Sequence, residues 1–176
     1  MKKILLLLLL PIFTFGQIST FPWIHNFDNN IGLEQEINDD GDWTINQGST
    51  SSYNTGPSGD HTTGNGSYYY VEASWPNYPN KTLITYTPTF DISTTPGKVL
   101  SFWYHMYGMD MGDLEIGVLD NNGYTVLDVK SGNYGDEWLF AYYPISSTDS
   151  FKIQFTATTG DLYTSDIAID DIMISD

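Results

Sequence analysis

Apolar and polar residues alternate with a period of two along much of this 176-residue chain, which is the pattern of strands with one buried face. The clearest stretch is 100–106, where Leu100, Phe102, Tyr104 and Met106 would line one side of a strand. Similar alternation or short apolar runs predict further strands at 67–73, 83–87, 114–118, 125–129, 138–143, 151–155 and 167–169. Helical periodicity is not found beyond the first 16 residues, so we expect an all-β domain.

Turn-forming residues separate these segments. Asn122-Gly123 lies between two of them and favours a tight β-hairpin. Further turns are expected at 95–97, 133–136 and 159–161. Many short strands joined by turns are typical of an antiparallel β-sandwich, and we predict a jelly roll in a single domain. The stretch 44–65, rich in Gly, Ser, Thr and Asn, is interpreted as a long surface loop of that domain.

The first 16 residues have the organisation of a secretory signal peptide. Lys2 and Lys3 precede the apolar run 4–10, and Gly16 provides a small residue near the expected cleavage point. Pro11 interrupts the run before it reaches the ~20 residues that a membrane-spanning helix needs. We therefore predict a signal peptide at 1–16 and one domain at 17–176. That domain would be secreted or held at the cell surface, without membrane insertion after cleavage.

Charge and cysteine content narrow the functional classes. The chain has 22 Asp and Glu residues against 6 lysines and no arginine, which gives a net charge of −16. Because contacts to phosphate need clustered basic residues, this balance excludes nucleic-acid binding and disfavours anionic membrane surfaces. The sequence has no cysteine, which excludes disulfides, thiolate zinc sites and thiol catalysis. An aromatic content of 15% fits a packed core rather than a disordered acidic segment.

Several short motifs follow one another in an order that is found in a known extracellular module. They are His25-Asn26-Phe27-Asp28, the acidic run 38–42 before Trp43, 55–62 leading into 64–68, 100–108 followed by 111–114, 132–138, and Ile167-Ala168-Ile169-Asp170-Asp171-Ile172. Together they resemble the MAM domain of meprins, neuropilins and receptor tyrosine phosphatases over residues 21–176. Members usually carry cysteines near the positions of His25, Glu34 and Val99. A cysteine-free copy with a short, lysine-led signal resembles secreted proteins of bacteria.

The resemblance implies a non-catalytic role in adhesion or protein binding, and a structural calcium ion. Related jelly-roll modules hold such a cation between the first strand, a loop and the last strand, and the matching carboxylates here are Asp28, Asp60 and Asp170. Calcium takes about six to eight hard oxygen ligands. Carboxylates that a fold brings together without a cation repel each other, so a bound ion would also stabilise the domain. The alternative is that these residues are solvated acids at turns and strand ends.

A catalytic role is not supported by the motifs. Ser58, Asp60 and His61 are the residue types of a hydrolytic triad, but neighbours in one loop rarely reach triad geometry. The surrounding residues also do not form a nucleophile-elbow motif or a zinc-binding motif. We therefore predict no catalytic residue in this chain.

Aromatic residues in loops and on sheet faces are the candidate ligand contacts, because Tyr and Trp are favoured at interfaces. Trp75 and Tyr78 lie in a proline-containing loop that could present both rings, and Tyr68 and Tyr70 are further candidates. The alternative is that these rings belong to the core, because most Trp and Tyr residues of a sandwich are largely buried. We expect an extracellular protein partner. One alternative is a glycan, bound as in jelly-roll carbohydrate-binding modules, and another is an accessory domain of a larger secreted hydrolase. A row of coplanar exposed rings would favour a glycan, and a flat mixed patch a protein.

Overall fold

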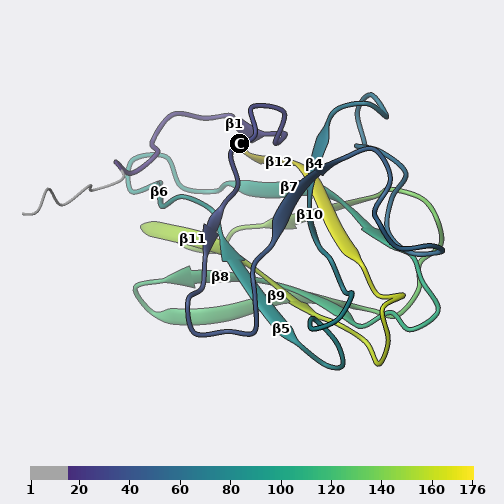
Figure 1. Ribbon diagram of the computed structural model, residues 1–176. Helices are drawn as coiled ribbons and strands as arrows, with labels where there is room; N and C mark the ends of the chain where they lie inside the picture. The colour runs from purple at the N-terminus through teal and green to yellow at the C-terminus, as the bar shows by residue number, and fades with distance from the viewer. Residues whose placement is uncertain (1–15) are drawn as a thin grey trace, which may run out of the picture.

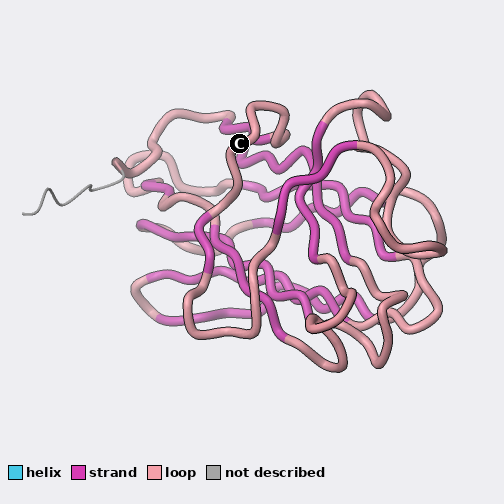
Figure 2. Tube along the Cα trace, viewed as in Figure 1, coloured by secondary structure: helices cyan, strands magenta, loops and turns pink. Residues whose placement is uncertain are grey.

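The computed structural model describes residues 16–176, which form a two-layered antiparallel β-sandwich (Figure 1). Residues 1–15 of the predicted signal peptide lie outside the described range. Strands and loops make up all of residues 16–176 (Figure 2). In that part of the chain, no helix has the length and apolar character needed to cross a membrane.

Each layer of the sandwich is one sheet. The first sheet has the strand order β10-β7-β12-β4-β3, with β1 beside β12, and the second has the order β2-β5-β11-β8-β9, with β6 beside β11. The strands are β1 (Trp23–His25), β2 (Glu34–Gln35), β3 (Thr44–Gln47), β4 (Ser67–Val71), β5 (Thr82–Tyr86), β6 (Phe90–Asp91), β7 (Val99–Met106), β8 (Asp113–Asp120), β9 (Gly123–Ser131), β10 (Leu139–Pro144), β11 (Ser150–Thr158) and β12 (Ile167–Ser175).

The predicted strands are all present, and their alternation explains which side each one buries. In β7, the four residues Leu100, Phe102, Tyr104 and Met106 face the core, as their spacing indicates. The rings of Phe102 and Phe155 are both fully buried and meet edge to face across the two sheets, with 5.1 Å between their centroids. β8 and β9 form the predicted hairpin. The prediction of an all-β antiparallel jelly-roll sandwich is confirmed.

The sequence did not indicate the shortest strands. β1, β2, β3 and β6 have two to four residues each, which is too short for alternation to be detected. β3 (Thr44–Gln47) corrects the interpretation of 44–65 as loop throughout, since it pairs with β4 along one edge of the first sheet. The remainder of that stretch is not an ordinary surface loop either, because Thr50, Thr55 and Asp60 are buried.

The first and last strands lie side by side, as the resemblance implied. β1 pairs with the second half of β12, with His25 opposite Ile172. The register of β12 against β7 shifts between Asp170 and Met173, and Asp171 there has a positive φ of 49°. Asp170 faces outward by the normal alternation of β12, and the irregularity places Asp171 on the same side, so that both carboxylates contact His61.

A buried carboxyl group precedes β12. Asp166 is fully buried, and its Oδ1 accepts a hydrogen bond from the Ala73 N–H at 2.8 Å. Its Oδ2 has no hydrogen-bond partner among residues 16–176. Burial raises the pKa of Asp166 to about 7, and the negative charge of Glu72 acts in the same direction. This group therefore opposes folding when it is ionised.

We expect Asp166→Asn to raise the free energy of unfolding at pH 8 by about 1–3 kcal/mol, because it removes a buried and underpaired charge. A carboxyl group with a folded-state pKa of about 7 and an ordinary value of 3.8 binds a proton on folding in this interval. Its favourable contribution is complete below about pH 4 and is lost as the pH rises to about 7. Urea denaturation at pH 5 and pH 8 tests this. The free energy of unfolding should differ less between pH 5 and pH 8 in Asp166→Asn than in the unchanged protein. An equal difference in the two proteins would contradict the prediction.

Candidate functional site

A loop spanning 48–66 covers part of the outer face of the first sheet. The indole Nε1–H of Trp138 donates to the Gly59 carbonyl oxygen at 3.1 Å. The His61 ring stacks on Trp103 with 3.7 Å between ring centroids and 15° between planes. Below the loop, Tyr68 and Tyr70 pack with Ala168 into a small apolar cluster separate from the main core. These contacts hold the acidic part of the loop against β12.

Asp60 is buried at the centre of this loop and organises its turn. Its carboxylate accepts hydrogen bonds from the Thr63 N–H at 2.9 Å, the Gly66 N–H at 2.6 Å and the Thr63 hydroxyl at 3.0 Å. Burial alone would raise the pKa of Asp60, but these hydrogen bonds outweigh it and lower the pKa. Asp60 is therefore a carboxylate held in its ionised form.

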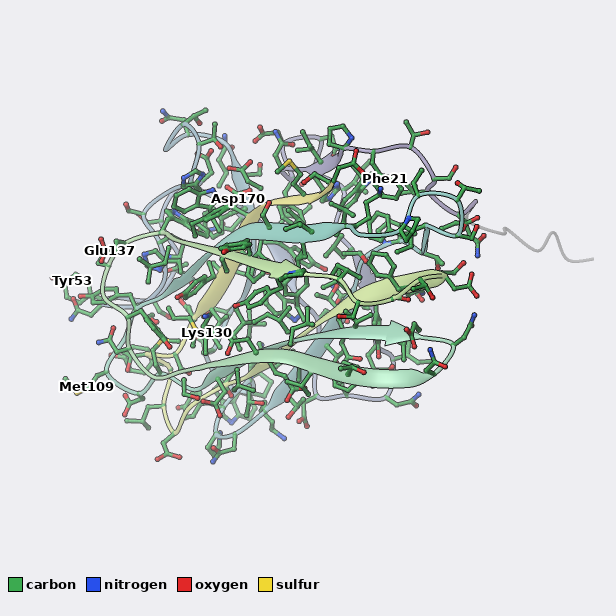
Figure 3. The ribbon with its side chains drawn as sticks, turned by 180° about the vertical axis from the view of Figure 1, so that it is seen from behind. Phe21, Tyr53, Met109, Lys130, Glu137 and Asp170 are labelled. Atoms are coloured by element: carbon green, nitrogen blue, oxygen red, sulfur yellow. The ribbon has the colours of Figure 1, made fainter. Side chains whose placement is uncertain are left out.

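Asp170 faces the same loop from β12 (Figure 3). Its Oδ2 accepts a hydrogen bond from the backbone N–H of His61 at 3.0 Å, and its Oδ1 accepts one from the Asp171 N–H at 2.8 Å. Asp170 is only 1% exposed. Burial raises its pKa to about 7, and the neighbouring charges of Asp171 and Asp60 contribute to the rise.

Asp28 approaches from the turn that follows β1. Its Oδ1 accepts a hydrogen bond from the Ser67 N–H at 2.9 Å, and its Oδ2 accepts one from the Asn26 side chain at 2.9 Å. A Cβ atom at Gly66 would lie 2.5 Å from Asp28 Oδ1 and 2.9 Å from Asp60 Oδ2, so both carboxylates crowd the same glycine. The absence of a side chain at Gly66 permits this close approach.

The structure thus gathers the three predicted carboxylates around one short loop segment, which we call the acidic cluster (Asp28, Asp60 and Asp170). Asp28 and Asp60 meet at Gly66, and Asp60 and Asp170 are close enough for their charges to interact. All donors are hard oxygens, the ligand type that calcium prefers. In the geometry that the structure gives residues 16–176, no set of three or more His, Cys, Asp or Glu side chains is arranged to hold a metal ion.

The two histidines of this face have structural partners. His61 Nδ1 lies 2.7 Å from Asp171 Oδ2, while Asp60 is bonded to the backbone of its own loop. The triad-like residues of the loop therefore do not form a charge-relay arrangement. His105 is 2% exposed, and its Nε2 lies 3.2 Å from Asp136. Burial lowers the pKa of His105, and the Asp136 carboxylate opposes this shift.

The aromatic candidates divide into exposed and buried residues. Trp75 is 79% exposed, and Tyr78 beside it is half-buried. Tyr68 and Tyr70 are buried under the 48–66 loop, so their proposed role as surface contacts is wrong. They lie on the outer face of their sheet, as alternation indicates. Neither the sequence pattern nor its periodicity shows that the preceding loop folds back over this face.

Two exposed rings on β10 are candidate contacts that the sequence pattern did not single out. Phe140 and Tyr142 are 54% and 65% exposed on the outer face of the first sheet, with 22° between their ring planes and 6.5 Å between centroids. The Phe140 ring also packs against Trp103 on the neighbouring strand, with 5.2 Å between the ring centroids. The available signal was that 138–143 is apolar on both faces, although only one face of a sandwich strand can enter the core.

Comparison with known families places this fold among extracellular modules. The family model for the MAM domain, described as meprin/A5/mu, matches residues 26–176. The chain belongs to the MAM family. The identification made from the order of its motifs is confirmed, and the family's fold has formed here without any cysteine.

Three curated relatives of this MAM domain are vertebrate proteins. Thyroid hormone-induced protein B of Xenopus laevis is 39% identical over 149 residues, covering 82% of this chain and 21% of the relative. MAM domain-containing protein 2 of Mus musculus is 37% identical, covering 84% and 22%. MAM domain-containing glycosylphosphatidylinositol anchor protein 1 of Homo sapiens is 34% identical, covering 85% and 16%. The chain thus spans about a fifth of the length of these relatives, and a bacterial origin stays a prediction.

Solved structures share the sandwich at low sequence identity. The K1 cleaved adhesin domain of Lys-gingipain from Porphyromonas gingivalis W83 superposes with a TM-score of 0.59 at 15% identity, covering 89% of this chain and 98% of that one. TmCBM61, solved in complex with β-1,4-galactotriose, has a TM-score of 0.53 at 13% identity, with coverages of 85% and 92%. These similarities establish the jelly-roll fold of the MAM domain and nothing about its ligand.

Proposed function

We propose that this MAM domain is a secreted, non-catalytic module that binds an extracellular protein. The observation that carries the proposal is the family match over residues 26–176, because the MAM domain is an extracellular module. Its exposed aromatic face on β10 and β7 supports the same role, since aromatic residues are favoured anchors at protein interfaces. The fold presents this face on a rigid sheet.

Binding of the purified, fluorescently labelled protein to intact cells or extracellular matrix tests this function. We expect saturable binding that is lost when the target surface is first treated with protease. Glycosidase treatment of a matched sample should leave binding intact. Loss of binding after glycosidase but not after protease would replace the protein partner with a glycan, and no saturable binding to any such surface would contradict both.

A glycan is the second candidate, and one observation favours it. Phe140 and Tyr142 are exposed, adjacent and nearly parallel, and side-by-side rings of this kind can stack on sugars. The third ring of the face, Trp103, is tilted by 54° from Phe140, so the platform does not continue across the sheet. A glycan array with purified protein tests this candidate, and binding there should be lost in Phe140→Ser/Tyr142→Ser if the rings hold the sugar.

We also propose that the acidic cluster binds a structural calcium ion. Asp28, Asp60 and Asp170 come from the β1 turn, the 48–66 loop and β12, so a cation between them would join three segments that are distant in sequence. Ionisation of Asp170 beside Asp60 and Asp171 is unfavourable without a counter-charge, and calcium would supply one. The carboxylates currently accept backbone N–H bonds, so binding requires their remaining lone pairs and nearby carbonyl oxygens.

A further inference from the structure

β10 forms one edge of the first sheet, and its sequence is unusual for an edge strand. Within residues 16–176, its backbone pairs with β7 on one side, and no backbone hydrogen bond reaches the other side. Sheet edges are normally protected by charged residues or by prolines along the strand. β9 and β2, which end the second sheet, carry charges, and β3 is polar. β10 has the uncharged run Leu-Phe-Ala-Tyr-Tyr and ends at Pro144.

The side chains beside this edge form an aromatic row, which we define as Tyr142, Phe140, Trp103 and His61. Phe140 stands opposite Trp103 in the β10–β7 register, and His61 stacks on the Trp103 indole. The row therefore runs from the free edge of the sheet to the loop that carries Asp60. The two outermost rings are the most exposed, and their faces are accessible to a partner.

The charge around the row is negative. Asp136 has a side chain that is 60% exposed, and the exposed Glu137 lies in the loop leading into β10 (Figure 3). Each lysine of residues 16–176 is already in an ion pair: Lys81–Asp40, Lys98–Asp176, Lys130–Asp128 and Lys152–Glu34. Lys130 also lies over the Tyr143 ring of β10, which packs against the core on the face opposite Phe140 and Tyr142. Aromatic faces attract cations, and the acidic surface strengthens that preference.

We propose that an extended, lysine- or arginine-bearing segment of a protein partner docks on the free edge of β10 and continues the first sheet as an added strand. Its backbone would pair with β10, and its cationic side chains would lie over Phe140 and Tyr142 and near Asp136 and Glu137. A second copy of this chain is disfavoured as the occupant because each copy carries a net charge of −16. This inference rests on the proposed protein-binding function and names the partner's chemistry.

The experiment uses purified protein and a capped octapeptide of alternating threonine and lysine, measured by isothermal titration calorimetry. We expect binding that weakens as NaCl is raised from about 50 to 300 mM, since the attraction is largely between charges. A peptide with glutamate in place of lysine should not bind. A lysine peptide that is N-methylated on alternate residues should lose most of its affinity, because one edge of its backbone can no longer donate hydrogen bonds.

Two sets of variants locate the site. Phe140→Ser/Tyr142→Ser should lower the affinity for the lysine peptide by about tenfold, because two ring–cation contacts are lost. Tyr163→Ser removes a ring that is 45% exposed in the loop before β12 and should leave the affinity unchanged. Hydrogen exchange should also show that amides of β10 become protected when the peptide binds, which a diffuse electrostatic contact would not produce.

Equal binding of the lysine and glutamate peptides, full affinity of the N-methylated peptide, or no effect of the double substitution would each overturn this proposal. Dimerisation that is lost in Phe140→Ser/Tyr142→Ser would assign the edge to a second copy and also overturn it. Glycan binding that depends on the same two rings would do so as well. Protease-sensitive binding to cell surfaces that survives the double substitution would overturn only the location, leaving the protein-binding function in place.

Discussion

Calcium is expected to raise the melting temperature of the metal-stripped protein by about 5–10 °C when it is supplied at ~100 times its Kd. That excess of ligand contributes ~2.7 kcal/mol to stability. For a domain of this size, each 1 kcal/mol corresponds to about 2–4 °C. The ion would offset the repulsion among Asp28, Asp60 and Asp170, which the structure places around one loop segment. Differential scanning calorimetry with calcium and with a chelator measures the shift.

Asp60→Asn and Asp170→Asn should each remove this calcium response. Asp170→Asn is the sharper test, because the amide oxygen can still accept a backbone N–H while the unfavourable charge is removed. Its melting temperature without calcium should therefore equal or exceed that of the unchanged protein, so lost sensitivity would not reflect unfolding. Asp149→Asn, an exposed acid bonded to Asn121, is the matched control and should retain the full response. A calcium shift that persists in both cluster variants would refute the site.

The sequence predicted the long strands because their patterns are local. Alternation along β7 and β11 records which face enters the core, and the structure buries those residues. β1, β2, β3 and β6 depend instead on pairing with strands distant in sequence, for which two to four residues contain no periodic signal. Their positions follow from the register of the larger strands, which only the assembled sheet defines.

The carboxylates of the candidate site could be predicted from the sequence better than its exposed aromatic side chains. The family resemblance identified Asp28, Asp60 and Asp170, and the structure brings them together although the three segments are far apart in the chain. Surface rings depend on what covers them, which local sequence does not record. Tyr68 and Phe140 both lie on outer faces of the first sheet, yet the 48–66 loop buries the first and leaves the second exposed.

The largest loss of stability is expected from Phe155→Ala, which should lower the free energy of unfolding by about 3–5 kcal/mol. Phe155 is fully buried on β11, and its ring packs edge to face on Phe102 from the opposite sheet. The protein has no disulfide to hold the sheets together, so contacts of this kind must do so. The free energy of unfolding of a typical domain is about 5–15 kcal/mol, so this loss would remove a large part of it. Urea denaturation followed by tryptophan fluorescence measures it.

Phe140→Ala provides the matched control, because it removes the same ring from a strand of the same sandwich. Phe140 is 54% exposed, so its truncation leaves no cavity and should change the free energy of unfolding by no more than about 0.5 kcal/mol. The two substitutions therefore separate the rings that close the sandwich from the rings that face a partner. If Phe155→Ala lowered the free energy of unfolding no more than Phe140→Ala, the inward packing of β11 would be wrong. The outer rings of β10 could then no longer be assigned to binding rather than to stability.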